Sequence, residues 1–257
     1  MTDRTETYEV EGKPHVALYL QAGDIRLKEA ADSRVVISMS GSSEALDAID
    51  IDATSESVTV RSAAKQRRWF GRGSVDTVVK LPAGADVTIH NGAGDILVGP
   101  PVGDLEIHAG SGDIRGDRVG GATEIKVGAG DVRMGTLVGP VKVTSASGDV
   151  RIDSAGEINV STAAGDLYLR EINDSARVKS ATGDIRIRKF AGSDLEIKTM
   201  SGDSTIGLVQ GMVVKAAIKT MSGDFRNQIK PSAGEKTGTM NLTVTSFAGD
   251  VTLKAAK

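Results

Sequence analysis

The chain has 257 residues, of which 31 are basic and 34 acidic, and its formal net charge of −3 offers no basic field for nucleic acid. It has no cysteine, which excludes disulfides and cysteine-based metal sites, and no apolar run of the roughly 18 residues that a membrane span needs. The start, MTDRTETYEV, lacks the apolar core of a signal peptide, so a cytoplasmic protein is expected.

The first 85 residues predict an N-terminal β section. Residues 16–27 (VALYLQAGDIRL) alternate apolar and polar side chains, and further alternating runs follow at 34–40, 56–62 and 76–82. We expect these strands to be partly antiparallel and to join and cap the rest of the chain. No segment has a convincing helical pattern.

The run KQRRWFGRG at 65–73 interrupts this section and gathers basic and aromatic side chains. Tryptophan and arginine are common anchors of interfaces. Such a tip is suited to a protein contact, or to a membrane surface or nucleic acid. Alternatively, the run is a hairpin whose tryptophan folds back and caps the end of the fold. The interaction candidates here are Trp69, Phe70, Arg67, Arg68 and Arg72.

A Gly-Asp dipeptide recurs along the chain at an almost constant interval. From Asp95 to Asp203 the steps are 17 to 19 residues. A period of this length is typical of one coil of a solenoid, whose coils bury a common core only by stacking. The aspartates are Asp24, Asp95, Asp113, Asp131, Asp149, Asp166, Asp184, Asp203, Asp224 and Asp250.

An apolar frame surrounds each Gly-Asp. The residue six positions before the aspartate is apolar in every copy, and the residue one position after it is apolar in nearly all copies. The apolar positions are even before Gly-Asp and odd after it, which predicts a corner that keeps both rows pointing inward. Glycine permits the positive φ of a sharp corner, and aspartate can bond nearby backbone amides. We expect structural corners at Asp95, Asp113, Asp131, Asp149, Asp166, Asp184, Asp203 and Asp224.

These patterns predict an all-β, right-handed, single-stranded β-solenoid of about ten coils, that is, a parallel β-helix. Its hand follows the general right-handedness of parallel crossovers. The expected organisation is a cap over 1–85 and one continuous solenoid over 86–257. The last two steps lengthen to 21 and 26 residues, and residues 227–240 are expected to form a polar loop.

The segment VKLPAGADVTIHNGAGDI (79–96) and the repeated Ser-Gly-Asp coils resemble a bacterial putative-adhesin family of unknown function, also called Toastrack. The resemblance covers most of the chain. It implies a right-handed β-solenoid, supplies no catalytic residues to carry over, and suggests a surface, envelope or scaffold component.

Two sets of side chains invite a metal hypothesis. The aspartate row resembles a calcium ladder, but an arginine two residues later in six coils favours acid–base pairing instead. His90 and His108 occupy the same position in neighbouring coils, yet no third ligand is evident. We therefore predict no metal site, no cofactor and no catalytic residues.

The sequence favours a non-enzymatic scaffold or protein-interaction module, with a glycan- or envelope-binding surface as the alternative. The last coil ends soon after Val251 and Leu253 without a cap, and solenoid ends normally need covering. Either the loop at 227–240 folds over that end or another chain covers it. We expect a protein partner or a second copy there, and a dimer is favoured over a filament because the N-terminal section closes the other end. We expect no nucleic-acid partner; contact with a glycan or a membrane surface stays open.

Overall fold

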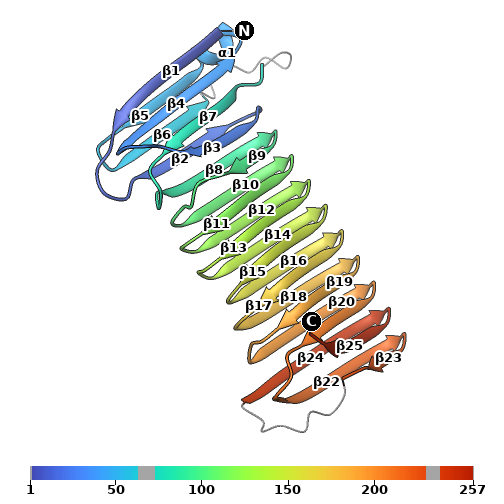
Figure 1. The fold of residues 1–257 in the computed structure, drawn as a ribbon. Coiled ribbons are helices and arrows are strands. Elements are labelled where there is room, and N and C mark those ends of the chain that lie inside the picture. Colours follow the sequence, from blue (N-terminus) through green and yellow to red (C-terminus); the bar gives the residue numbers. More distant parts are fainter. Residues whose placement is uncertain (1, 63–72, 230–237, 257) are drawn as a thin grey trace. The chain divides into compact units, whose positions relative to one another are not determined.

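The computed structural model describes residues 2–62, 73–229 and 238–256 (Figure 1). Almost all of its regular structure is β-strand, as the sequence predicts. The chain divides into two compact parts, residues 1–130 and 131–257, which are described in turn. The expected boundary at residue 85 stays a prediction.

The first part holds two sheets, with the strand orders β1-β4-β7-β3-β9-β11 and β12-β10-β8-β2-β6-β5. Its strands are β1 (Thr2–Glu9), β2 (His15–Leu20), β3 (Ile25–Glu29), β4 (Arg34–Gly41), β5 (Ile49–Ala53), β6 (Ser57–Ser62), β7 (Asp76–Leu81), β8 (Asp86–Ala93), β9 (Ile96–Val98), β10 (Leu105–Ser111), β11 (Ile114–Val119) and β12 (Thr123–Ala129).

The second part also holds two sheets, with the orders β13-β15-β17-β19-β21-β25-β23 and β14-β16-β18-β20-β24-β22. Its strands are β13 (Val132–Leu137), β14 (Val141–Ser147), β15 (Val150–Ala155), β16 (Ile158–Ala164), β17 (Leu167–Ile172), β18 (Ser175–Thr182), β19 (Ile185–Phe190), β20 (Asp194–Ser201), β21 (Ser204–Leu208), β22 (Met212–Ser222), β23 (Phe225–Asn227), β24 (Gly238–Ala248) and β25 (Val251–Ala255).

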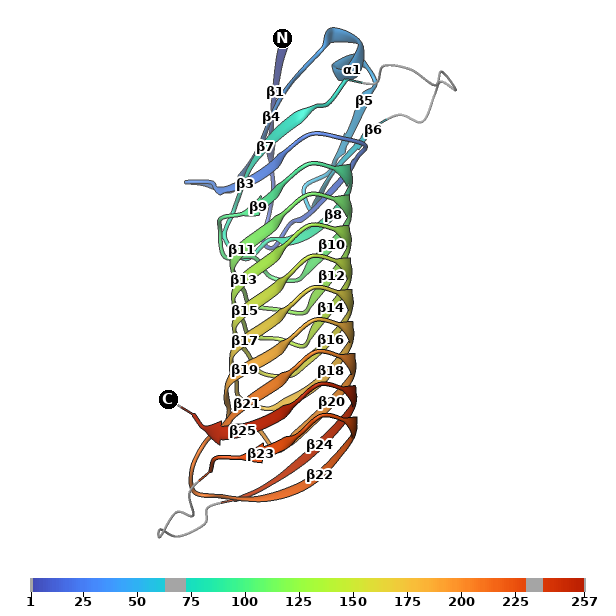
Figure 2. The same cartoon turned by 90° about the vertical axis from the view of Figure 1, so that its right-hand side faces the viewer.

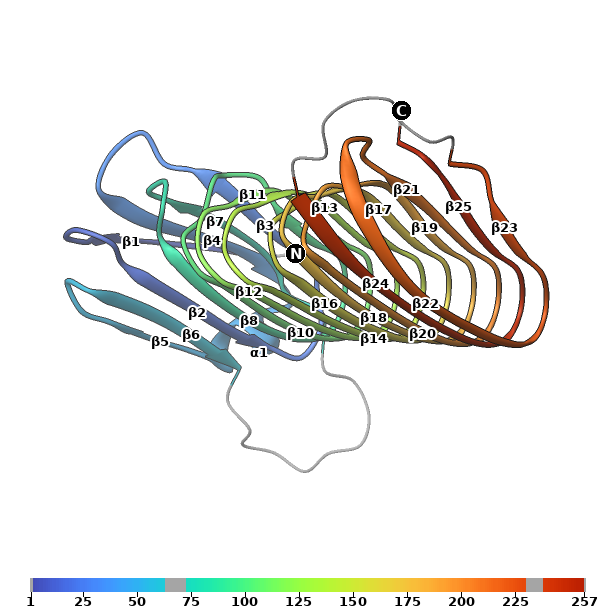
Figure 3. The same cartoon turned by 90° about the horizontal axis from the view of Figure 1, so that it is seen from below.

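Each regular coil gives one strand to each sheet, with Gly-Asp between them, and this is a β-solenoid. Val143, Val160 and Val178 pair in parallel register on β14, β16 and β18, and all three are fully buried. The same inward row and the row after Gly-Asp form the aliphatic core, as predicted. Figure 3 shows β16 and β18 on one side of the coils and β17 and β19 on the other.

The corners require glycine for two reasons. Gly165 has φ of 123°, a backbone conformation that side chains with a Cβ rarely adopt. A Cβ on Gly165 would also lie 2.3 Å from the carbonyl oxygen of Gly148 in the preceding coil. The expectation of a positive φ at the Gly-Asp corners is confirmed, since each of these glycines has φ between 115° and 139°.

The N-terminal section is partly antiparallel, as expected. β1 runs antiparallel to β4, β4 to β7, and β5 to β6, whereas β2 and β3 already join the parallel sheets. The expectation of no helix is wrong, because α1 (Ser43–Asp47) lies beside β1, β4 and β5 (Figure 2). The Ser42 side chain caps the N-terminus of α1, and Leu46 is the buried residue of this helix. Five residues are too few to show a helical period. No helix among the described residues is long and apolar enough to cross a membrane.

The last two coils stack in the reverse of their sequence order. β24 lies between β20 and β22, and β25 lies between β21 and β23 (Figure 2). The expectation that the last strand in sequence is the last in the stack is therefore wrong. β24 buries Met240, Leu242 and Val244, whereas β22 offers Ala216 opposite Leu242. Met240 and Leu242 of β24 are larger than Val214 and Ala216, their partners on β22, and burial of larger side chains favours β24 in the place that is covered on both sides.

Candidate functional site

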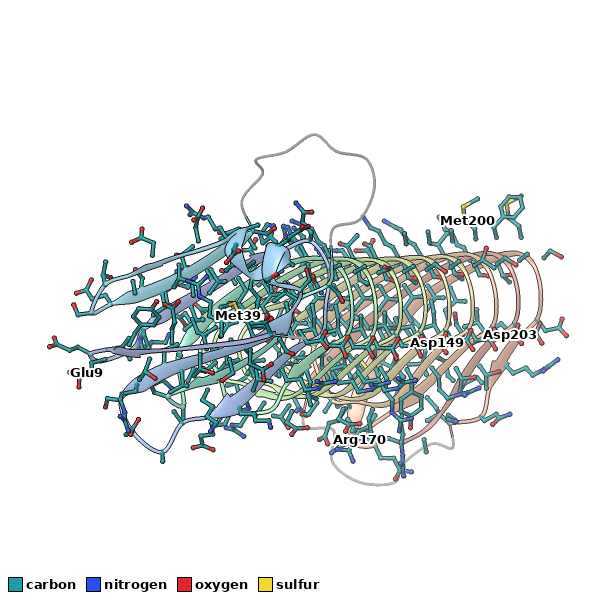
Figure 4. The ribbon with its side chains drawn as sticks, turned by 90° about the horizontal axis from the view of Figure 1, so that it is seen from above. Glu9, Met39, Asp149, Arg170, Met200 and Asp203 are labelled. Atoms are coloured by element: carbon teal, nitrogen blue, oxygen red, sulfur yellow. The ribbon has the colours of Figure 1, made fainter. Side chains whose placement is uncertain are left out.

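The aspartate row forms a ladder of hydrogen bonds between coils. One carboxylate oxygen of Asp131 accepts from the backbone N–H of Asp149 at 3.0 Å, and Asp149 accepts in turn from Asp166 at 2.8 Å. The same bond joins further aspartates in each part. In each of the following pairs the carboxylate of the first residue accepts from the backbone N–H of the second: Asp76 and Asp24, Asp24 and Asp95, Asp95 and Asp113, Asp166 and Asp184, Asp184 and Asp203, Asp203 and Asp250, Asp250 and Asp224. Asp149 and Asp203 are labelled in Figure 4.

Arginine engages the second oxygen of several of these carboxylates. Oδ2 of Asp131 accepts from Arg133 at 2.7 Å, and Arg226 lies 3.3 Å from Asp224 and 3.1 Å from Asp250. A carboxylate held in this way uses both oxygens inside the chain, one on the backbone and one on a guanidinium. These contacts give the aspartate row a structural role at the corners of the coils.

The coil formed by β22 and β23 is paired on one side only among the described residues. Phe225 lies in register with Val251, which is fully buried, yet Phe225 itself is 46% exposed. Ile218 is half-buried, although it lies in register with the fully buried Val244. This terminal coil presents inward-row side chains over which no further coil of residues 2–62, 73–229 and 238–256 lies.

An apolar strip lies beside the terminal coil on the outer face. Met221, Phe247 and Met200 each lie one residue before a paired position on β22, β24 and β20, and they are 76%, 57% and 64% exposed. Met200 points away from the coils (Figure 4). The equivalent residues on β14, β16 and β18 are alanines, namely Ala146, Ala163 and Ala181. The large side chains are therefore confined to the last three strands of this sheet.

The interaction candidates from the sequence have two different outcomes. Val251 and Leu253 are 0% and 2% exposed, and β25 is covered on both sides by β21 and β23, so the reason for choosing them is gone. Phe225 and Met221 take the exposed place instead. The candidates Trp69, Phe70, Arg67, Arg68 and Arg72 lie outside the described residues.

A second cluster lies on the outer face of the first part. Tyr19, His90, His108 and Lys126 occupy one column across β2, β8, β10 and β12. The ring centroids of Tyr19 and His90 are 4.9 Å apart, and those of His90 and His108 are 4.5 Å apart. The Lys126 ammonium nitrogen lies 3.2 Å from Nε2 of His108 and donates to it. The column is therefore a stack of three rings, those of Tyr19, His90 and His108, followed by the ammonium group of Lys126.

Glu106 joins this cluster and was missed from the sequence. Glu106 and His108 are two residues apart on β10, so both side chains leave the same face of the sheet. A Glu106 carboxylate oxygen lies 3.3 Å from Nε2 of His108. The Glu-x-His spacing on a predicted strand was the signal that could have identified it.

The surroundings of His108 favour its neutral imidazole. Burial, followed by the nearby Lys126 and His90, lowers the pKa of His108 below its ordinary value. Both histidines also line an open hollow of about 360 Å³, together with Tyr19, Gln21 and Ser62. Water and small solutes therefore reach this part of the surface.

Comparison with known proteins identifies the family of the chain. The Toastrack DUF4097 family, whose function is unknown, matches residues 15–254. No curated protein matches the chain.

Solved structures of bacterial proteins also resemble it. A putative adhesin from Bacteroides fragilis is 14% identical, with 98% of this chain and 97% of that one covered and a TM-score of 0.49. A putative adhesin from Parabacteroides distasonis is 12% identical, with the same coverage and a TM-score of 0.42. A putative lipid binding protein from Parabacteroides distasonis is 10% identical, with 95% and 96% covered and a TM-score of 0.43.

Proposed function

We propose that this protein, which belongs to the Toastrack DUF4097 family, is a non-enzymatic scaffold that binds a protein partner. The family match confirms the predicted resemblance. The observation that carries the proposal is the coil of β22 and β23, which is paired on one side only in the part of the chain that the structure describes, with Phe225 46% exposed and Met221 76% exposed. An edge strand with unpaired backbone groups and apolar neighbours is a template for another chain.

The chemistry of this surface favours protein over glycan. Met200, Met221 and Phe247 offer flexible thioethers and one ring, and none of the three side chains supplies a hydrogen-bond donor. Sugar hydroxyls need polar partners close to an apolar face. Methionine and phenylalanine at the centre of a contact are typical of protein interfaces.

A second copy of the chain is the partner that we favour. In the first part, α1 contacts β1 and β5, and Leu46 of α1 and Ile49 of β5 are buried. Among the described residues, the terminal coil of the second part has no comparable cover. A single self-complementary surface favours a closed dimer, because a filament needs two complementary surfaces.

The lysines of β22 restrict how two copies can meet. An antiparallel pairing of β22 with itself about Ala217 would place Lys215 opposite Lys219 of the second copy, and directly opposed like charges destabilise a sheet. We therefore place the contact at Phe225 and the strip of Met221, Phe247 and Met200.

Sedimentation velocity over about a hundredfold range of protein concentration tests the proposal, since self-association depends on mass action. The wild-type chain is expected to shift from monomer to dimer. The double variant Phe225→Lys, Met221→Lys is expected to stay monomeric and to keep the wild-type circular dichroism spectrum, because both side chains are exposed.

Val138→Lys is the matched control, because Val138 is 54% exposed but lies between β13 and β14 rather than on the terminal coil. It should dimerise like wild type. A wild-type chain that remains monomeric at every concentration would contradict the dimer and direct the search to a different protein. Equal loss of dimer in the control would contradict the assigned surface.

A further inference from the structure

We propose that His90, His108 and Glu106 bind a divalent transition-metal ion of the zinc class on the outer face of the sheet formed by β8 and β10. This inference is independent of the proposed function, since its residues lie in the first part of the chain and the terminal coil lies in the second.

The register of the sheet brings the ligands together. His90 on β8 pairs with His108 on β10 in parallel register, so the two imidazoles leave the same face one strand apart. Glu106 lies two residues before His108 and therefore projects from that face as well. All three side chains are half-buried, which restricts their rotamers while leaving access to solvent.

The distances suit a small ion. The three ligand atoms lie within 4.8 Å of one another, and one pair, Glu106 Oε1 and His108 Nε2, is 3.3 Å apart. Two ligands of a tetrahedral zinc ion, each about 2.1 Å from it, lie roughly 3.4 Å apart. One pair is already at that separation, and modest side-chain rotation brings in the third.

The kind of ligands selects the kind of metal. Imidazole nitrogen suits zinc, copper, nickel and iron, whereas calcium and magnesium prefer oxygen ligands. Two histidines and one glutamate are a ligand set that zinc accepts with a fourth position left to water or another ligand. The open hollow beside both histidines gives that position access to solvent.

Lys126 competes for the same nitrogen. Its ammonium lies 3.2 Å from Nε2 of His108, so a metal must displace it. Lys126 also lies 2.9 Å from a carboxylate oxygen of Glu124, which can hold the ammonium after displacement. Removing this lysine should therefore strengthen metal binding, whereas removing a ligand should weaken it.

Isothermal titration of the tag-free 257-residue chain with Zn²⁺ alone tests the site. Wild type is expected to bind one ion per chain with a saturable isotherm. His90→Ala and His108→Ala should each weaken binding by at least about tenfold, the range reached even by loss of a ligand's hydrogen-bond partner. Glu106→Gln should weaken it to a lesser extent, and Lys126→Met should tighten it several-fold.

His15→Ala is the matched control, since His15 bonds Thr88 and is not part of the cluster. It should bind Zn²⁺ like wild type. A melting temperature that rises with Zn²⁺ in wild type and in His15→Ala, but not in His108→Ala, is expected as the second readout. Absence of saturable binding, or equal weakening by His15→Ala and His90→Ala, would overturn the proposal.

Discussion

Replacing Asp149 by alanine and by asparagine separates the hydrogen bond of a corner from its charge. In wild type the Asp149 carboxylate accepts from the backbone N–H of Asp166 at 2.8 Å. Alanine removes both the acceptor and the charge. Asparagine removes the charge but keeps an oxygen that can accept the same bond.

The hydrogen bond sets the expected size of the difference. A net intramolecular hydrogen bond contributes about 1 kcal/mol to stability, and less where water can replace it. The bond lies at an exposed corner. We therefore expect the free energy of unfolding of Asp149→Ala to be lower than that of Asp149→Asn by about 1 kcal/mol or slightly less.

The charge acts in the opposite direction. Asp131 and Asp166 lie in the neighbouring coils, at a strand spacing of about 4.8 Å. Two like charges about 5 Å apart in water repel by roughly 0.8 kcal/mol before screening by salt. The Arg133 guanidinium already offsets the charge of Asp131. Asp149→Asn should therefore be as stable as wild type or slightly more stable at low salt.

Urea denaturation followed by circular dichroism measures these differences, with and without calcium. The three proteins should show the same slope with urea, and calcium should leave every curve unchanged. Equal destabilisation of both variants would refute the corner hydrogen bond as the cause, and a rise in stability with calcium that only wild type shows would establish the aspartates as a calcium site.

Two further predictions concern another corner and a surface ion pair. Gly165→Ala should destabilise by at least about 2 kcal/mol, because a non-glycine residue is strained at positive φ and its Cβ would meet the Gly148 carbonyl. Gly156→Ala, whose Cβ would make only an ordinary contact with the Val138 carbonyl oxygen at 3.8 Å, should be nearly neutral in the same urea titration. Hydrogen bonds from Lys198 and then Arg177 lower the pKa of Glu196 to about 2 from 4.5, so its stabilisation is full above pH 4.5 and is lost as the pH falls toward 2. Because Lys198 and Arg177 are exposed, Glu196→Gln should differ from wild type by less than about 1 kcal/mol at neutral pH, and the difference should shrink as the pH falls through about 2. A difference that grows in acid would contradict this assignment.

The sequence alone determined the coil and its corner. Each repeat encodes its own strands through alternation of apolar residues, and each Gly-Asp supplies a positive φ and a backbone acceptor. These are local properties of the sequence, and each of the ten similar copies carries them. Val143, Val160 and Val178 each lie six residues before an aspartate, in a row that the pattern predicts to point inward, and the structure pairs them in register and buries them.

Only the tertiary structure decided which residues are covered and which meet across coils. The sequence cannot state that β24 enters between β20 and β22, because this order depends on competition between distant strands for the covered place. That exchange buries Val251 and exposes Phe225. Glu106 became a candidate ligand in the same way, since its distance to His90 depends on how two coils stack rather than on either coil alone.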